Sequence, residues 1–390
     1  MVATVAGVRR LLAVDATVDE TFVDRLRSAW EAGDAVLPLD PRLPPAARAQ
    51  LLADLRPGDG VDAGDALVVA TSGTTGRAKG VVLTHDAVAA SAGATSARLG
   101  VEPDDDTWLC CLPVAHVGGL SVVTRALLTG TGLVMGDVDR PGATLVSLVA
   151  TQLRRVDPAR WRTIVLGGSA PPGDVPGNVV ATYGLTESGS GCVYDGVPLD
   201  GVEVRIDPGN VVALRAPMLL RAYRSFDGDE DPKDADGWLR TGDAGELGPD
   251  GRLRVLGRVD DVIVTGGEKV WPDAVEAALR GVPGVADVAV VGCPDEEWGQ
   301  RVVAVIVPAP TAAGRPALAE LRGAVKEVLP AWCAPKEVTL VAALPRTSVG
   351  KVRRAEVRRL LAESAPAPES GDDGGQQGAA VDHQRGAGHP

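Results

Sequence analysis

The chain has 390 residues, 45% of them hydrophobic, which is enough to bury a large core and to form two domains. A formal net charge of -13 repels nucleic acid and anionic membranes at long range and argues against both as partners. No apolar run approaches the roughly 20 residues that a membrane-spanning helix needs, so we expect a cytoplasmic protein without membrane insertion. The five cysteines show neither metal-ligand nor redox spacing, and we expect them to be reduced.

The first part of the chain alternates strand-like apolar runs with helical periodicity, as α/β domains do. Helices are expected at 22–32, 45–55 and 84–99, the last with Thr84 as N-cap, and buried strands at 66–70, 108–112, 163–166 and 179–181. These elements predict an α/β fold whose large N-terminal domain, residues 1–257, has sheets packed with helices.

After Arg240 the pattern changes to short strands rich in turns, and a second alternation of elements follows. We expect helices at 272–280 and 318–329 and strands at 288–292 and 302–308. They indicate a small α+β domain, residues 258–363. Residues 364–390 are polar and rich in Gly and Pro, which predicts a disordered tail.

The segment Thr71-Ser-Gly-Thr-Thr-Gly-Arg-Ala-Lys-Gly80 follows the first apolar strand and contains glycines, hydroxyls and two cations but no acid. Converging backbone N–H groups, hydroxyls and a cation such as Lys79 or Arg77 suit a phosphate. The spacing does not fit a Walker P-loop, because the Gly-Lys-Ser/Thr ending is absent. Alone, the segment is explained equally well as a flexible surface turn.

Seven further motifs follow this loop in order. They are Pro113-Val-Ala-His-Val-Gly-Gly119, Leu166-Gly-Gly-Ser169, Tyr183-Gly-Leu-Thr-Glu187, Thr241-Gly-Asp243, Gly257-Arg-Val-Asp-Asp261, Gly266-Gly-Glu-Lys-Val-Trp-Pro272 and Pro345-Arg-Thr-Ser-Val-Gly-Lys351. With the loop, they resemble the adenylate-forming superfamily, which includes acyl-CoA synthetases, luciferases and peptide-synthetase adenylation domains. The resemblance implies a ligase that uses ATP and Mg²⁺ to activate a carboxylic acid as an acyl-adenylate and passes the acyl group to coenzyme A.

The resemblance also implies roles for individual residues. Lys351, Thr186 and His116 would be catalytic, Glu187 the magnesium ligand and Asp260 the hinge of a mobile C-terminal domain, with Gly266 and Gly267 lining the coenzyme A channel. ATP or AMP would be bound by Thr71, Ser72, Gly73, Thr74, Thr75, Lys79, Gly168, Ser169, Tyr183, Gly184, Asp243, Arg258 and Lys269. Taken singly, Asp243, Arg258 and Lys351 are also explained as surface charges, and the ordered set of motifs favours function.

The acid would meet His116, Gly119 and Arg125, which is the single charge within residues 117–130. A cation on such an apolar element needs an anion, and two alternatives stay open: an internal Asp or Glu, or a second carboxylate on the substrate. Within the superfamily the chain resembles most the o-succinylbenzoate-CoA ligases of menaquinone biosynthesis. That resemblance rests on a short N-terminal region, on the motif at 266–272 and on a basic residue nine positions after His116.

We therefore expect o-succinylbenzoate, ATP and coenzyme A to give o-succinylbenzoyl-CoA, AMP and pyrophosphate. The alternatives are another acyl- or aryl-CoA synthetase, an adenylating enzyme that loads a carrier protein, and a non-catalytic AMP-binding regulator. The sequence does not decide between a monomer and a homodimer. A hydrolase or dehydrogenase is not indicated, because neither a Gly-x-Ser-x-Gly elbow nor a convincing dinucleotide fingerprint occurs.

Overall fold

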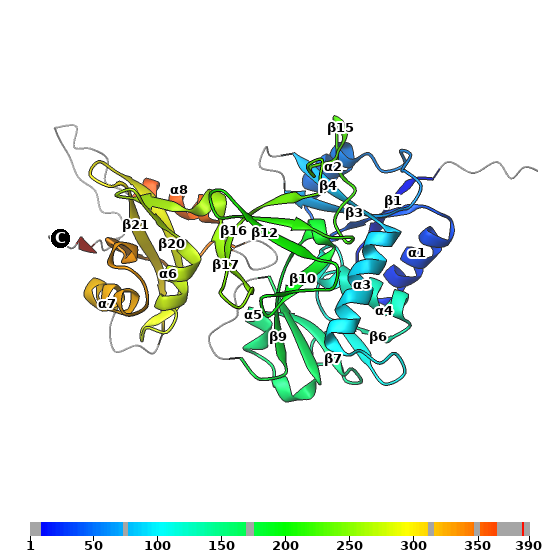
Figure 1. Ribbon diagram of the computed structural model, residues 1–390, viewed down its shortest axis with the longest axis horizontal. Coiled ribbons are helices and arrows are strands. Elements are labelled where there is room, and N and C mark those ends of the chain that lie inside the picture. Colours follow the sequence, from blue (N-terminus) through cyan, green and yellow to red (C-terminus); the bar gives the residue numbers. More distant parts are fainter. Residues whose placement is uncertain are drawn as a thin grey trace, which may run out of the picture. The chain divides into compact units, whose positions relative to one another are not determined.

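The computed structural model describes residues 9–72, 77–168, 175–310, 316–346, 352–364 and 384–385 (Figure 1). The chain divides into two compact units. Unit 1 comprises Met1–Pro208, Val212–Thr241 and Glu246–Arg254, and unit 2 comprises Gly209–Val211, Gly242–Gly245 and Val255–Pro390. The boundary expected at residues 257 and 258 stays a prediction.

The first sheet has six strands in the order β1-β2-β3-β4-β14-β15. Its strands are β1 (Leu11–Asp15), β2 (Ala35–Leu39), β3 (Asp65–Ser72), β4 (Ala78–Thr84), β14 (Ala222–Ser225) and β15 (Gly228–Glu230). Helices α1 (Glu20–Glu31) and α2 (Pro45–Leu55) lie between its first strands in the chain. β1, β2 and β3 pair in parallel, and β4 and β14 continue the sheet antiparallel. All of β2 is buried, as expected for a parallel strand covered on both faces.

The second sheet has seven strands in the order β11-β10-β9-β8-β7-β5-β6. Its strands are β5 (Thr107–Cys110), β6 (Gly132–Met135), β7 (Leu145–Val149), β8 (Thr163–Gly167), β9 (Val179–Leu185), β10 (Ser190–Tyr194) and β11 (Val197–Pro198). Helix α3 (His85–Leu99) leads from β4 of the first sheet to β5, and α4 (Val117–Thr129), α5 (Ala150–Leu153) and the 3₁₀ turns η1 (Pro158–Arg160) and η2 (Thr186–Ser188) lie between the strands of this second sheet. Thr84 caps α3 as predicted, because its hydroxyl accepts from the Ala87 N–H at 3.1 Å.

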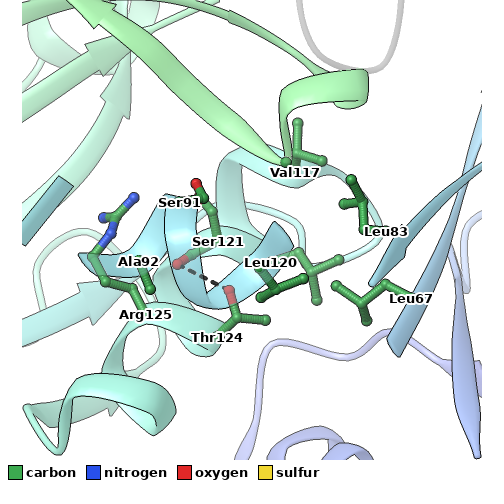
Figure 2. Close-up of a pocket in the computed structure, with 11 residues that line it drawn as sticks. Leu67, Leu83, Ser91, Ala92, Val117, Leu120, Ser121, Thr124 and Arg125 are labelled. Carbon is green, nitrogen blue, oxygen red and sulfur yellow. Dashed lines mark hydrogen bonds between the residues drawn. The ribbon is translucent and has the colours of Figure 1, made fainter. Parts of the chain in front are cut away.

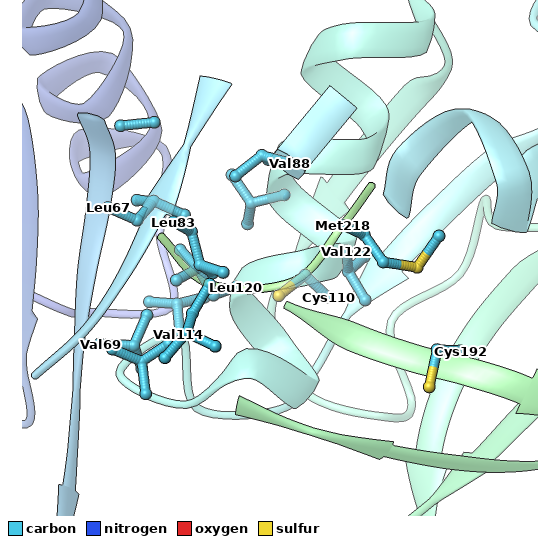
Figure 3. Close-up of a cluster of buried hydrophobic side chains, with 14 of the residues drawn as sticks. Leu67, Val69, Leu83, Val88, Cys110, Val114, Leu120, Val122, Cys192 and Met218 are labelled. Atoms are coloured by element: carbon cyan, nitrogen blue, oxygen red, sulfur yellow. The ribbon is translucent and has the colours of Figure 1, made fainter. Parts of the chain in front are cut away.

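The main core of unit 1 is formed by both of these sheets. Figure 3 shows Leu67 and Leu83 of the first sheet beside Leu120 of α4, and all three side chains belong to one buried cluster. Helix α3 lies between β4 and β5 in the chain, and α4 lies between β5 and β6. The two helices contact each other, so these two connections meet inside one core. The candidate site described below lies at this junction.

A four-stranded sheet follows, in the order β12-β13-β16-β17, with β12 (Glu203–Asp207), β13 (Val211–Arg215), β16 (Leu239–Leu247) and β17 (Leu253–Arg258). The sheet of unit 2 has the order β19-β18-β21-β22-β23, with β20 paired to β21. Its strands are β18 (Ile263–Thr265), β19 (Glu268–Val270), β20 (Val285–Asp295), β21 (Gly299–Pro308), β22 (Glu337–Leu340) and β23 (Gln384–Arg385). Unit 2 also contains η3 (Val259–Asp261), α6 (Pro272–Leu279), α7 (Leu318–Val328), η4 (Ala331–Cys333) and α8 (Arg354–Ser364).

Unit 2 buries both faces of the β20–β21 pair. Val288 and Val290 of β20 belong to one core cluster, and Ala289 and Val291, which alternate with them, belong to another that includes Val357 of α8. This alternation follows from the two-residue period of a strand. Helix α8 is thereby fixed on one face of the sheet of its own unit.

The α/β fold class is confirmed, but three local predictions need correction or comment. The segment 71–80 is not loop throughout, because Thr71 pairs with Lys79 and Ser72 with Ala78 in the β3–β4 ladder. β1 and β2 were not predicted. Of the predicted tail, Ser364 is the last residue of α8 and Gln384–Arg385 pairs with β22, and the rest lies outside the described residues. No helix in the described part of the chain is both long and apolar enough to cross a membrane.

Candidate active site

The phosphate loop is described at its two ends, where β3 and β4 hold it. The Thr71 hydroxyl donates to the Lys79 carbonyl at 3.2 Å, and the Lys79 ammonium lies 5.3 Å from the centroid of the Tyr223 ring. Tyr223 stands on β14, which pairs antiparallel with β4. Gly73, Thr74 and Thr75 lie outside the described residues, and of Ser72 only the backbone is described.

The motif 183–187 runs from the end of β9 into η2. Tyr223 donates its hydroxyl hydrogen to Glu187 Oε1 at 2.7 Å, so Lys79, Tyr223 and Glu187 form one connected group. Thr186 stands beside Glu187 at the start of η2. Gly184 has a steric reason to be glycine, because a Cβ there would lie 2.1 Å from the Ser190 carbonyl oxygen on β10. The structure therefore brings together the ends of two predicted motifs and adds Tyr223, which the sequence did not indicate.

Asp54 was also missed. Its side chain is 1% exposed at the end of α2, and it accepts from the Ala78 N–H at 3.0 Å and from Gln50 at 2.9 Å. Arg77 approaches the same carboxylate at 3.9 Å. A buried carboxylate therefore anchors the chain where it leaves the phosphate loop. The 24 positions between Asp54 and Ala78 explain why no local motif revealed it.

His116 is the N-cap residue of α4 but makes no side-chain cap. Its Nε2 is buried and has no hydrogen-bond partner among the described residues, and burial lowers the pKa of the imidazole. Gly119, one helical turn further, has a packing role, because a Cβ there would lie 2.4 Å from the Leu112 carbonyl oxygen. The motif 113–119 thus packs the start of α4 closely against the preceding loop and leaves a neutral imidazole at its tip.

Arg125 is 1% exposed and projects from α4 at the edge of a small cavity (Figure 2). Its Nη2 donates to Ser190 Oγ at 3.3 Å, and the guanidinium carbon lies 4.5 Å from the Trp108 ring centroid. Nε and Nη1 have no hydrogen-bond partner, and no carboxylate lies within 4.0 Å, among the described residues. Burial lowers the pKa of Arg125. Of the two alternatives for its counter-ion, the internal Asp or Glu is therefore not supported within the described chain.

The remaining cavity lining comes from several parts of unit 1. It includes Leu67, Leu83, Val88, Ser91, Ala92, Val117, Leu120, Ser121, Thr124 and Gly189. In Figure 2 the Thr124 hydroxyl donates a hydrogen bond to the Ser121 carbonyl of the same helix. The free volume is about 10 Å³, room for about one water molecule.

The predicted residues of unit 2 form a second group. Arg258 Nη1 donates to Asp243 Oδ1 at 3.1 Å, and Gly242 leaves space for that guanidinium, because a Cβ at Gly242 would lie 2.4 Å from Arg258 Nη2. Asp260 is in η3. The pair expected to hold a ribose is thus assembled in this unit.

The turn at Gly266 and Gly267 joins β18 to β19, and both glycines have positive φ angles of 60° and 86°. Lys269 follows on β19 and is exposed. The Trp298 ring packs against Gly266, and the Trp298 carbonyl accepts a hydrogen bond from the Gly266 N–H at 2.9 Å. Lys336 lies 3.0 Å from the Trp298 ring centroid. Sequence reasoning missed Trp298 and Lys336, because only the fold places them at this turn.

Two other predicted residues cannot be placed: Ser169 and Lys351 lie outside the described part of the chain. Gly168 is described and follows β8 with a φ of +91°, a conformation that favours glycine. Among the described residues no group of three His, Cys, Asp or Glu side chains could hold a metal ion. A single carboxylate such as Glu187 fits magnesium nonetheless, since this ion takes one or two carboxylates together with water and phosphate oxygens.

Comparison with known proteins defines the class first. Residues 56–217 match the family described as AMP-binding enzyme, and residues 274–351 match the AMP-binding enzyme C-terminal domain. The two matches include the phosphate loop, the motif 183–187 and the lysine loop. Enzymes of this class use a nucleotide, and the resemblance to adenylate-forming enzymes is thereby confirmed.

A probable 2-succinylbenzoate–CoA ligase from Mycobacterium tuberculosis is 40% identical over 358 residues, covering 82% of this chain and 91% of that protein. A 2-succinylbenzoate–CoA ligase from Bacillus cytotoxicus is 33% identical and covers 76% and 70%. The structure of o-succinylbenzoate CoA synthetase from Bacillus subtilis, in complex with the acyl-adenylate intermediate OSB-AMP, aligns with a TM-score of 0.70 at 26% identity, covering 89% and 83%. The chain belongs to the 2-succinylbenzoate–CoA ligase family.

Proposed function

We propose that this chain catalyses the AMP-forming ligation of o-succinylbenzoate to coenzyme A. The acid oxygen attacks the α-phosphorus of ATP and pyrophosphate leaves; the thiol sulfur of coenzyme A then attacks the acyl carbonyl and AMP leaves. The relatives named above act on this acid. The observation in this chain that carries the choice of acid is the isolated positive charge of Arg125.

A buried guanidinium without an acid partner costs free energy that folding does not recover. A substrate with two carboxylates resolves the problem, because one carboxylate reacts while the other approaches Arg125. The free volume beside Arg125 holds about one water molecule. The second carboxylate therefore reaches Arg125 either through that water or after side chains of the cavity move.

The group around Lys79 supports the nucleotide part of the proposal. Lys79 supplies positive charge for the phosphates, and Glu187 is proposed as the carboxylate that holds Mg²⁺, with Tyr223 fixing its orientation. Magnesium would neutralise phosphate charge as the acid attacks. Thr71 and Thr186 stand at the edges of the same group, where the Thr186 hydroxyl would donate to a phosphate oxygen and the Thr71 hydroxyl would do so once it leaves the Lys79 carbonyl.

The remaining assignments are part of the same proposal. Tyr183 stacks on adenine, Asp243 and Arg258 bind the ribose, and Lys351 stabilises charge at the α-phosphorus. Domains 1–257 and 258–363 turn about Asp260 between the two half-reactions, so that Gly266 and Gly267 replace Lys351 at the site for the coenzyme A step. We place the enzyme in the cytoplasm and keep a homodimer as one possible assembly.

The test of function uses the purified chain with ATP, magnesium and coenzyme A, a panel of acids and mass detection of products. We expect o-succinylbenzoyl-CoA, formed without any added carrier protein. Preference for a fatty acid or an amino acid would overturn the choice of substrate, and thioester formation only on a carrier protein would overturn the choice of acceptor.

The role of Arg125 needs its own comparison. We expect Arg125→Ala to weaken apparent affinity for the diacid, while analogues that lack one of its two carboxylates lose little. The matched control is Arg98→Ala, an exposed arginine at the end of α3. If Arg125→Ala leaves the apparent affinity for o-succinylbenzoate unchanged, Arg125 does not anchor the substrate.

A further inference from the structure

One half-buried arginine in unit 2 connects two motifs that are far apart in sequence. Arg354 is the first residue of α8 and follows Lys351 by three positions. Its Nη1 donates to Asp261 Oδ2 of η3 at 3.2 Å, across 93 positions of sequence. Its Nη2 donates to Glu276 Oε1 of α6 at 2.7 Å and to Asp273 of the same helix. We call Arg354, Asp261, Asp273 and Glu276 the arginine cluster.

One acid of the arginine cluster, Glu276, is buried and has several hydrogen-bond donors. Glu276 is 3% exposed and accepts from the Val290 N–H of β20 at 3.0 Å and from Arg280 at 3.1 Å. Burial raises the pKa of Glu276, and the charge of Arg354 acts in the opposite direction. A carboxylate in such a place is stable only while its donors stay in position, so the cluster joins α8, α6, η3 and β20 into one body.

The chain on both sides of residues 347–351 is fixed next to this cluster. Arg346 and Val352 form an antiparallel bridge, and the Arg353 N–H donates to the Pro345 carbonyl at 2.9 Å. Arg346 also donates to Asp287 at 2.6 Å at the start of β20. Arg346 and Val352, which flank the lysine loop, therefore form one closed base, and Arg354 is the second residue beyond that base.

We infer that Arg354 is a positioning residue that fixes the base of the lysine loop to the hinge segment, so that Lys351 turns as one body with η3. The inference rests on the proposed function, in which Lys351 serves adenylation. Because Lys351 takes no part in the thioester step, Arg354 supports the first half-reaction selectively. A planar guanidinium suits this task, since it can donate to several carboxylates in fixed directions, which an ammonium cannot.

The experiment measures the two half-reactions separately. ATP–pyrophosphate exchange reports adenylation, and conversion of supplied acyl-adenylate with coenzyme A reports thioester formation. For Arg354→Lys we expect kcat of exchange to fall about 10- to 100-fold, as displacement of a catalytic group by about 1 Å does, with KM for ATP little changed. The thioester step should stay within about threefold of the parent.

A second variant guards against a folding defect. Asp261→Asn removes the negative charge of the hinge arm, which also lies 3.9 Å from Arg358, and leaves Asp273 and Glu276 to pair with Arg354. It should show the same selective loss of exchange, while circular dichroism and thermal unfolding stay close to those of the parent. The matched control is Arg280→Gln, because Arg280 shares Glu276 but contacts neither η3 nor α8 through the bonds described; it should leave both half-reactions unchanged.

Amide hydrogen exchange gives a readout that needs no activity. If the cluster couples the two segments, Asp261→Asn should speed exchange both at Val262 and Ile263 and at Val357 of α8, whereas Arg280→Gln should not. Faster amide exchange confined to Val262 and Ile263, or an equal fall in the rates of both half-reactions, would overturn the inference. A parent protein that adenylates a different acid with the same dependence on Arg354 would instead leave the inference standing and reject the proposed substrate.

Discussion

A buried arginine in unit 1 and a half-buried arginine in unit 2 have opposite surroundings. Arg125 in unit 1 is 1% exposed and meets a Trp ring and a Ser hydroxyl, whereas the Arg354 side chain in unit 2 is 12% exposed and meets three carboxylates. Burial lowers the pKa of Arg125. Burial opposes the charge of Arg354 as well, but Glu276 and Asp273 raise its pKa.

In the proposed function the difference corresponds to two roles, with Arg125 held for a ligand and Arg354 held for the architecture. The charge of an arginine surrounded by acids is compensated inside the protein, and removing Arg354 takes one cation from the buried carboxylate of Glu276. An arginine without acids carries an unrecovered desolvation cost, which a bound anion can recover. The two sites should therefore respond in opposite ways to substitution, and each prediction below is a way to break or sharpen this contrast.

The largest effect is expected at the lysine that Arg354 is inferred to position. Lys351→Ala should lower ATP–pyrophosphate exchange by about 10²- to 10³-fold, because the charge that develops at the α-phosphorus loses its cation. Conversion of supplied acyl-adenylate should persist. Lys326→Ala on α7 is the control, since that lysine is exposed. ATP–pyrophosphate exchange as fast as in the parent would contradict the proposed role of Lys351 and the mechanism that depends on it.

The next effect is on stability. Arg354→Met should lower the free energy of unfolding by about 3–5 kcal/mol, because Glu276 and Asp273 then lose a buried cation. Urea unfolding monitored by circular dichroism measures it. An exposed pair, Arg27 with Asp24, provides the control, and Arg27→Met should change stability by less than about 1 kcal/mol. A similar small change for Arg354→Met would contradict the assigned role of the cluster.

Arg125→Met should act in the opposite sense. Its unfolding free energy should equal or exceed that of the parent, because an apolar side chain replaces a charge without an acid partner. KM for o-succinylbenzoate should rise about 10- to 100-fold with the loss of a charge-assisted hydrogen bond. Thermal shift with the diacid should stabilise the parent and not the variant. Strong destabilisation of the unliganded variant would show that Arg125 is structural.

The anchor of the phosphate loop should give a smaller effect. Asp54→Asn keeps the shape of the side chain but weakens its bond to the Ala78 N–H, and the unfolding free energy should fall by about 1–3 kcal/mol. KM for ATP should rise severalfold, because Lys79 follows Ala78 directly. Asp24→Asn, at an exposed acid, should change neither quantity. Unchanged ATP kinetics in Asp54→Asn would limit Asp54 to a structural role.

The smallest effect is a dependence on pH. Burial lowers the pKa of His116, so below about pH 6.5 the unfolded chain binds the proton more readily than the folded one. The contribution of neutral His116 to stability is therefore present above about pH 6.5 and is lost as the pH falls through the lowered folded value. His116→Gln should reduce the difference between urea midpoints at about pH 7.5 and about pH 5.5; an unchanged difference would assign it to other groups, such as His85.

The elements that could be predicted are those with strong local signals. The helices at 45–55 and 85–99 have a proline at the first turn and a Thr cap, and both begin within one residue of prediction. β2 was missed because Pro38 interrupts its apolar run, and proline usually marks an edge strand. In the fold β2 is nevertheless central, between β1 and β3, with Pro38 opposite Val14.

The site shows the same division. Motifs carry their chemistry in adjacent residues, so the sequence alone indicated the phosphate loop, Glu187 and the basic residue at 125. Tyr223, Asp54 and the partners of Arg354 were not indicated, because each contact joins residues separated by 24 to 93 positions. Local spacing contains no information about such contacts, since only strand order and helix packing bring them together.

The sequence by itself identified the class of enzyme, because the ordered motifs resemble those of adenylate-forming enzymes and the family models match the same parts of the chain. Only the tertiary structure decided which charges are compensated. The sequence does not distinguish the surroundings of Arg125 from those of Arg354. In the fold, Arg354 contacts three acids, and Arg125 contacts none within the described chain. The physical reason is that the free energy of a buried charge depends on its neighbours in space, and these are set by packing across the whole chain.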